Sequence, residues 1–260
     1  MFKNLDPVPA VGADALASGK RALVWDSAWA SLAGGWSGGV VLVAFALSLG
    51  AQPMVIGLLA AIPFAAQAVQ LPTIFMVEKF RQRKKIGVIA LNLARLVIVL
   101  LGLLPFFVPG PWQLPLLLAA QLAIAVLGSV AACAINSWFH QLLPPSGLGE
   151  FFSKRLLIAS MATCASTLVA GLLVDHPPLG QANYAFALAF VAAGLAGFAS
   201  SACLARAPEP EMHPPSAPMP LRNMLRAPMF NPNFRSLALM LCSWNLASNL
   251  VAPFLTVYLT

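Results

Sequence analysis

Charged side chains are scarce in this sequence. Only 9% of its 260 residues are Asp, Glu, Lys or Arg, whereas 60% are hydrophobic. A soluble chain of this length needs far more polar side chains to cover its surface. The scarcity therefore excludes a soluble globular protein, and it predicts that most of the chain faces lipid.

Histidine and cysteine are also scarce, with three and four residues respectively. His140, His176 and His213 lie at the ends of apolar stretches or between them, and each cysteine lies in a different stretch, without metal-ligand spacing. No pair of acidic residues forms a catalytic motif. We therefore expect no metal, no other cofactor and no enzyme activity. An intramembrane enzyme is kept as the alternative from outside transport.

Seven apolar stretches are long enough to cross a membrane, since a spanning helix needs about 20 apolar residues to cross about 30 Å of hydrocarbon. Short gaps separate most of them, which makes neighbouring helices antiparallel. The predicted fold class is all-α, in a polytopic membrane protein. The predicted spans are residues 22–49, 54–76, 86–108, 114–139, 156–174, 183–205 and 236–260.

The basic residues are distributed unevenly between the gaps. All but one of the 15 Lys and Arg residues lie outside the spans, and the gaps at 50–53, 109–113 and 175–182 contain none. Because loops rich in Lys and Arg stay in the cytoplasm, this pattern places the N-terminus inside, in a bacterial inner membrane. The net charge of +7 then reflects topology and contact with the lipid bilayer, and nucleic acid is not an expected partner.

Four segments follow from this layout. Residues 1–21 are a cytoplasmic N-terminal segment without the apolar core of a signal peptide, and residues 22–205 are a six-helix bundle. Residues 206–235 are a cytoplasmic, Pro-rich linker, and residues 236–260 are a seventh helix. A lone seventh span would leave its polar amides without partners in lipid, so we expect a fragment that lacks a second helical bundle. A genuine seven-span protein is the alternative.

The gap between the second and third spans carries a recognisable motif. Residues 77–85 read Val-Glu-Lys-Phe-Arg-Gln-Arg-Lys-Lys. This stretch resembles the loop signature of the Major Facilitator Superfamily (MFS) of transporters, although Ile74 and Arg81 stand where the family has glycine. The charged positions of that signature fall on Glu78, Lys79, Arg83 and Lys84.

The resemblance implies a fold and a function. The fold would be the N-terminal bundle of an MFS transporter, built from two three-helix repeats, followed by the start of a second bundle. The function would be secondary transport of a small-molecule substrate by alternating access, with a coupling ion as a further candidate partner. The four motif residues would then form a cytoplasmic gate, whereas a simple topology anchor is the alternative for Glu78. The membrane domain of an ATP-driven transporter is the main rival within transport.

Two charged residues lie inside the predicted spans, Asp26 and Arg95. A charge at mid-membrane costs about 2.5–3.5 kcal/mol, so each demands a reason. We hypothesise that they pair within the bundle. The alternative has Asp26 solvated at the inner interface and Arg95 hydrogen-bonded to Asn92, three residues earlier on the same helix face.

The first span also contains glycines at 34, 35, 38 and 39. These glycines indicate either close helix packing or a locally unwound segment at mid-membrane. Other polar and aromatic residues inside spans are candidates to line a substrate cavity, because such groups in lipid either join helices or line a pathway. The cavity candidates are Trp29, Trp36, Ser37, Gln67, Gln70, Asn136, Asn245 and Asn249.

Overall fold

The computed structural model describes residues 6–9, 11–143, 147–212 and 230–259, with side chains except at position 179 and at 249–259. The chain divides into two compact units, Met1–Glu211 and Met212–Thr260. Within the described ranges the regular structure is helical, and one isolated β-bridge joins Val8 to Pro210. The predicted all-α fold is therefore confirmed.

Each predicted span falls on one or more helices of the described residues. In this part of the chain, six helical stretches are long and apolar enough to cross a membrane, so the protein is a polytopic integral membrane protein. The helices of the first unit are α1 (Ala13–Ser37), α2 (Gly39–Ser48), α3 (Pro53–Ala66), η1 (Gln67–Val69), α4 (Gln70–Phe80), α5 (Arg83–Phe107), α6 (Gly110–Leu142), α7 (Leu148–Asp175), η3 (Pro178–Gly180) and α8 (Ala182–Arg206). The predicted seventh span lies in α10 (Pro232–Leu259) of the second unit, which is not among those six.

Two of the six spans are interrupted. The first is divided between α1 and α2, and the second contains the 3₁₀ turn η1 between α3 and α4. Pro63 lies inside α3, four residues before η1, where a proline removes a backbone hydrogen bond and bends the helix. The other four spans are continuous helices.

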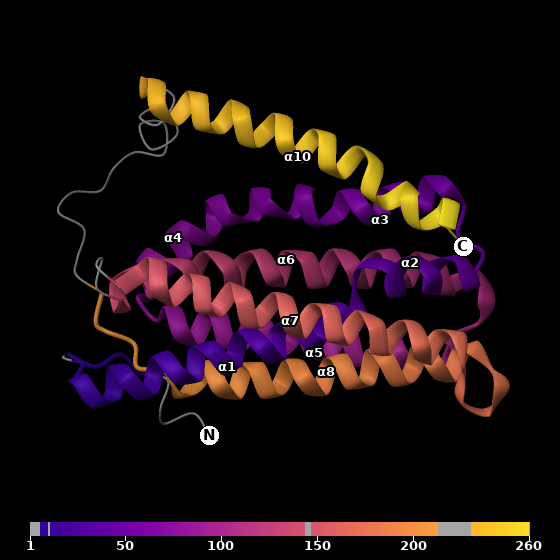
Figure 1. The fold of residues 1–260 in the computed structure, drawn as a ribbon, viewed down its shortest axis with the longest axis horizontal. Helices are drawn as coiled ribbons and strands as arrows, with labels where there is room; N and C mark the ends of the chain where they lie inside the picture. The colour runs from indigo at the N-terminus through magenta and orange to yellow at the C-terminus, as the bar shows by residue number, and fades with distance from the viewer. Residues whose placement is uncertain (1–5, 10, 144–146, 213–229, 260) are drawn as a thin grey trace. The chain divides into compact units, whose positions relative to one another are not determined.

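Small residues line helix α8, including Gly194, Gly197, Ser200 and Ser201. It packs against α1 and against α5 (Figure 1). A side chain at Gly194 or Gly197 would collide with Val99 or Arg95 of α5. Since lipid supplies no hydrophobic drive for association between helices, this close approach gives the van der Waals contact that holds them together.

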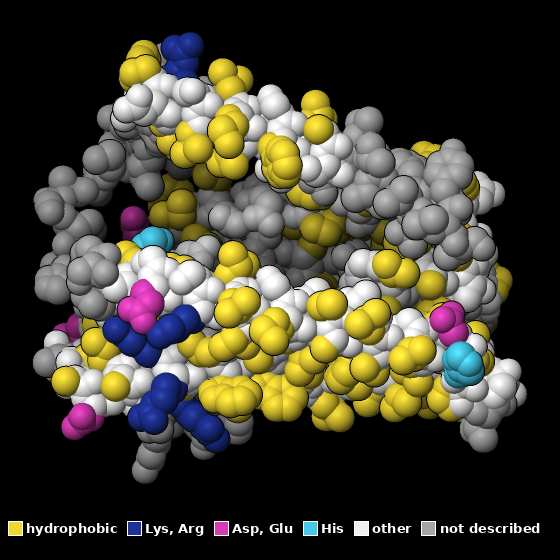
Figure 2. Space-filling view, in the orientation of Figure 1, with side chains coloured by type: hydrophobic (Ala, Val, Ile, Leu, Met, Phe, Trp, Pro, Cys, Tyr) yellow, Lys and Arg dark blue, Asp and Glu magenta, His cyan; other side chains and the backbone are white. Residues whose placement is uncertain are grey.

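The two ends of the first unit differ in charge. At one end lie the N-terminal part of α1, the α4–α5 and α6–α7 connections and the end of α8, which carry the loop Lys and Arg residues. We call this the basic end. Figure 2 shows Lys and Arg side chains gathered there, with many hydrophobic side chains along the helices beyond them. Large apolar residues such as Leu156, Met161 and Leu168 of α7 are exposed, as expected for a lipid-facing surface.

Candidate functional site

Asp26 is buried between three helices. Its Oδ2 accepts a hydrogen bond from Nη2 of Arg155 on α7 at 2.7 Å, and its Oδ1 accepts one from the hydroxyl of Ser200 on α8 at 2.7 Å. The carboxylate itself comes from α1, so one side chain joins α1, α7 and α8. Both oxygens have a partner, which is how a buried carboxylate avoids the full penalty of leaving water.

Arg95 of α5 lies near this carboxylate but does not bind it directly. Its charge interacts electrostatically with Asp26, whereas its buried Nε makes no hydrogen bond to any described residue. Gly197 of α8 leaves the space that the arginine stem occupies. The structure thus gives Asp26 a different ion-pair partner, Arg155, from the one expected. The reason is that α7 begins at Leu148 instead of 156, which brings Arg155 into the helix and level with Asp26.

These residues form a charge cluster, which we define as Asp26, Arg95, Arg155 and Ser200. One carboxylate faces two guanidinium groups, so the cluster carries an excess positive charge. Nε of Arg155 is also buried without a described partner, and its guanidinium lies 4.9 Å from the ring centroid of Phe139. An ionisable residue inside a membrane bundle is a candidate functional residue by default.

The first span is broken between α1 and α2. Helix α1 ends at Ser37, and α2 begins at Gly39, whose φ is +51°. Gly38 is extended, with φ −126° and ψ −168°. Gly35 packs on α7, because a side chain there would collide with the hydroxyl of Ser166. Close packing therefore applies to Gly35, whereas the loss of helical backbone occurs at Gly38 and Gly39.

The loop-motif residues separate into two groups. Arg83 and Lys84 are 2% exposed at the start of α5, whereas Lys79 is exposed at the end of α4 over the ring of Phe80. Glu78, on α4, makes no described ion pair with Arg83. Between the two groups Arg81 adopts a left-handed conformation, with φ +52°. That is where the resembled family has a glycine, and glycine is the residue that adopts this conformation without strain.

The segment after α8 folds back onto the basic end. We call residues 207–211 the strap. Oε1 and Oε2 of Glu209 accept hydrogen bonds from the backbone N–H groups of Arg83 and Lys84, at 2.8 and 3.2 Å. These groups are donors that the start of α5 cannot satisfy within the helix. The Glu209 carboxylate also forms an ion pair with Nε of Arg83 at 3.4 Å.

Further contacts hold the strap in place. The indole of Trp138 donates to the carbonyl of Pro208 at 3.0 Å, and Arg83 Nη2 donates to the carbonyl of Pro210 at 3.0 Å. On the other side, Val8 exchanges backbone hydrogen bonds with Glu209 and Glu211 at 2.8 and 3.1 Å. Burial raises the pKa of the Glu209 carboxyl above its ordinary value, against the backbone N–H groups and the Arg83 charge, which lower it.

The cavity candidates lie apart from the charge cluster. Trp29 is exposed, Trp36 is half-buried, and the hydroxyl of Ser37 donates to the carbonyl of Ala33 at 2.7 Å. Gln67 and Gln70 hydrogen-bond to each other at the 3₁₀ turn of the second span. These hydrogen bonds join residues three or four positions apart in the same span, so they do not connect different helices around a cavity.

The remaining cavity candidates lie on α6 and α10. Asn136 is exposed on α6. In the second unit, Asn245 donates to the carbonyl of Leu241 at 2.8 Å, and the side chain of Asn249 lies outside the described residues. Sequence reasoning missed Arg155, Ser200 and Glu209. Glu209 had one signal, since it and Glu211 are the only acidic residues in the linker.

Within the ranges described, no group of three or more His, Cys, Asp or Glu residues could hold a metal ion. Comparisons of the chain with protein-family models, with curated proteins and with solved structures find no match. The sequence and the structure alone therefore identify this chain as a multi-pass membrane protein with a charge cluster inside its helical bundle.

Proposed function

We propose that the protein is a secondary active transporter of the MFS type, which moves a small solute by alternating access. The single observation that carries the proposal is the ion pair of Asp26 and Arg155, with Arg95 nearby, inside the membrane bundle. Asp26 and Arg95 lie within predicted spans, where a charge at mid-helix costs about 2.5–3.5 kcal/mol. Helix α8 already packs through small residues, so stability alone does not require these charges.

The charge cluster lies where several helices meet, so a change in its charge would act on how these helices pack. Its members come from four different helices, α1, α5, α7 and α8. A change in the protonation of Asp26, or in the solute bound near the excess guanidinium, would therefore act on the packing of all four. Transporters use intramembrane carboxylates and guanidinium groups as such coupling sites.

The break between α1 and α2 supports the same function. Backbone groups at Gly38 and Gly39 leave the regular helical pattern within a membrane span. Non-helical backbone at membrane depth is tolerated where protein or a water-filled cavity surrounds it, and broken helices form the binding sites of several transporter folds. Trp36 and Ser37, which precede the break, are accordingly our first candidates to contact the solute.

Membrane, orientation and partners belong to the same proposal. The basic end faces the cytoplasm of a bacterial cell because Lys and Arg retain their loops on that side. A second helical bundle completes the transport pathway, and a solute or ion gradient supplies the energy. No chemical conversion of the solute takes place. Arg83 and Lys84, held by Glu209, close the cytoplasmic side together with Glu78 and Lys79.

Uptake into membrane vesicles tests the proposal. Vesicles from cells that express the protein are given a radiolabelled sugar, neutral amino acid, dicarboxylate or inorganic phosphate under an imposed pH gradient. We expect gradient-driven uptake of at least one solute, and its loss in Asp26→Asn. The matched control is Asp175→Asn, because Asp175 is exposed at the opposite end of α7.

Two outcomes would contradict the proposal. Uptake that requires ATP and persists without a gradient would favour the membrane domain of an ATP-driven transporter. Undiminished uptake in both Asp26→Asn and Arg155→Gln would show that the charge cluster only holds helices together. Elution of each variant as a single folded species in detergent is the check that separates lost transport from lost folding.

A further inference from the structure

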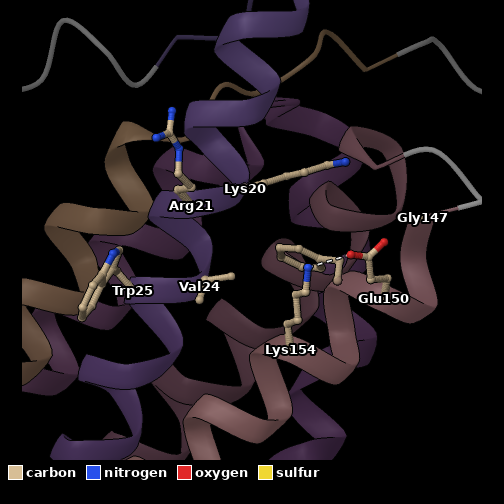
Figure 3. Close-up of a pocket in the computed structure, with 8 residues that line it drawn as sticks. Lys20, Arg21, Val24, Trp25, Gly147, Glu150 and Lys154 are labelled. Carbon is tan, nitrogen blue, oxygen red and sulfur yellow. Dashed lines mark hydrogen bonds and ion pairs between the residues drawn. The ribbon is translucent and has the colours of Figure 1, made fainter.

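A cavity of about 290 Å³ opens between α1 and α7 at the basic end. It is separate from the charge cluster. Figure 3 shows Lys20 extending from α1 toward α7, where Glu150 and Lys154 lie, while Arg21 and Trp25 lie along the other flank of α1. The cavity is lined by Lys20, Arg21, Val24, Trp25, Gly147, Glu150, Phe151 and Lys154.

The charges around this cavity are not balanced. Three cationic side chains accompany one carboxylate, that of Glu150. Lys154 Nζ contacts Glu150 Oε1 at 2.6 Å, but both side chains are more than half exposed, so water screens this pair. Lys20 and Arg21 make no hydrogen bond or ion pair with any described residue. The cavity therefore attracts a ligand with negative charge.

The surroundings of the cavity are both polar and apolar. Val24 and Phe151 contribute apolar walls, and the indole of Trp25, on the other flank of α1, is 63% exposed. Further along α7 the large exposed side chains are apolar, beginning with Leu156 and Leu157. Tryptophan beside basic residues at the end of a span is typical of the boundary between lipid headgroups and hydrocarbon. A ligand here would have an anionic group at one end and an apolar remainder.

We propose that this cavity binds the phosphate of an anionic phospholipid. Lys20 and Lys154 hold the phosphate oxygens from the two sides, and Arg21 adds positive charge at the rim. The acyl chains lie along the apolar surface of α7 below the cavity. A free phosphate ion shares the charge chemistry, but it has no use for the apolar walls or for the position at the membrane boundary. The site is independent of the proposed transport function.

Thermal unfolding of the purified protein in a neutral detergent tests this binding. Dioleoyl-phosphatidylglycerol, dioleoyl-phosphatidylcholine or inorganic phosphate is titrated in, and the apparent Kd is taken from the shift in Tm. We expect a shift with phosphatidylglycerol well above that with phosphatidylcholine, and none with phosphate. Lys20→Gln and Lys154→Gln should each weaken the affinity for phosphatidylglycerol about fivefold, as expected for one cation at a membrane surface.

Two further variants make the test specific. Glu150→Gln removes the competing carboxylate, so it should strengthen binding of phosphatidylglycerol. Arg206→Gln removes an exposed cation at the same end but outside the cavity, so it should leave the affinity unchanged. Lys154 and Glu150 are exposed, and their substitution should not disturb folding.

Three results would overturn the proposal. Equal shifts with the two lipids would show that charge is not recognised. A shift with phosphate alone, of the same size, would assign the cavity to a free anion. An equal loss of affinity in Arg206→Gln would reduce the effect to general attraction by a basic surface. None of these results bears on uptake, so the lipid site and the transport function can fail separately.

Discussion

Oε1 of Glu209 accepts hydrogen bonds from both the backbone N–H and the guanidinium Nε of Arg83, at 2.8 and 3.4 Å. The two residues are 126 positions apart in the chain. Through this contact the strap caps the start of α5 and neutralises a charge that the loop motif had assigned to an exposed gate. The contact makes the basic end an ordered part of the first unit, and it has measurable consequences.

Glu209→Ala should destabilise the protein by about 3 kcal/mol, because it leaves the Arg83 guanidinium buried without its carboxylate. Two backbone N–H groups at the start of α5 also lose their acceptor. Denaturation in detergent measures the change. Glu211→Ala is the matched control, since the strap uses only the backbone of this exposed residue. Equal effects of the two substitutions would contradict the role of the carboxylate.

Stability should also depend on pH through Glu209. Burial raises the pKa of this carboxyl above its ordinary value of 4.5, so the folded protein holds the proton more tightly than the unfolded chain. The contribution to stability is therefore fully present below pH 4.5 and is lost as pH rises through the raised pKa. The free energy of unfolding of the wild type, relative to Glu209→Gln, should therefore fall as pH rises from 4.5 through the raised pKa. A difference that rises with pH would show that the interactions with Arg83 outweigh burial.

Arg81→Gly should stabilise the protein by about 1 kcal/mol, since a side chain in the left-handed conformation costs about that much. The φ of Arg81 is +52°, and its N–H donates to the carbonyl of Val77 at 2.8 Å at the end of α4. Arg81→Ala is the control, because it removes the same charge and keeps the strain. If alanine stabilised as much as glycine, charge repulsion at the basic end would be the cause. The shift in Tm distinguishes the two.

Gly197→Ala should destabilise the bundle by about 1–3 kcal/mol, the usual effect of overpacking. A methyl group at this position would collide with the side chain of Arg95, so α5 and α8 must separate or Arg95 must leave the charge cluster. Gly171→Ala of α7 is the control, since a methyl group there meets nothing within 4 Å. Thermal unfolding of the two variants gives the comparison, and similar values would show that α8 does not depend on this close approach.

Orientation in the membrane can be tested by labelling. In a variant without the four native cysteines, Lys79→Cys at the basic end and Gln181→Cys at the opposite end are both exposed positions. A membrane-impermeant maleimide should label position 181 in intact cells and position 79 only after the membrane is opened. The reverse pattern would place the basic end outside and contradict the predicted topology.

The spans were predictable because their determinant is local. A stretch of about 20 apolar residues is energetically suited to hydrocarbon whatever its neighbours are. The first six predicted spans accordingly match the six helical stretches that could cross a membrane, with two of them extending one residue beyond the helix. The sequence also allowed us to predict that the glycines of the first span either pack closely or interrupt the helix, and Gly38 and Gly39 do interrupt it. Which glycines would pack and which would break the helix depended on the helix α7 beside them.

The charge cluster shows the limit of that reasoning. Asp26 and Arg95 were found because charges inside apolar runs are visible in the sequence. The ion-pair partner of Asp26 could not be found in the same way. Arg155 lies just outside the apolar run, and it reaches the site only because α7 begins at Leu148. Glu209 was hidden for a similar reason: a Pro-rich linker has no periodicity that indicates where it docks.

The sequence by itself determined that the chain is a membrane protein whose neighbouring helices are antiparallel and whose Lys and Arg residues gather at one end. The reason is that the free energy of transferring a residue into lipid depends on that residue and its near neighbours. Only the tertiary structure decided the pairing of Asp26 with Arg155 and the docking of Glu209 on Arg83. Both contacts join groups more than 100 positions apart, and their geometry depends on how closely the small residues of α8 let the helices approach.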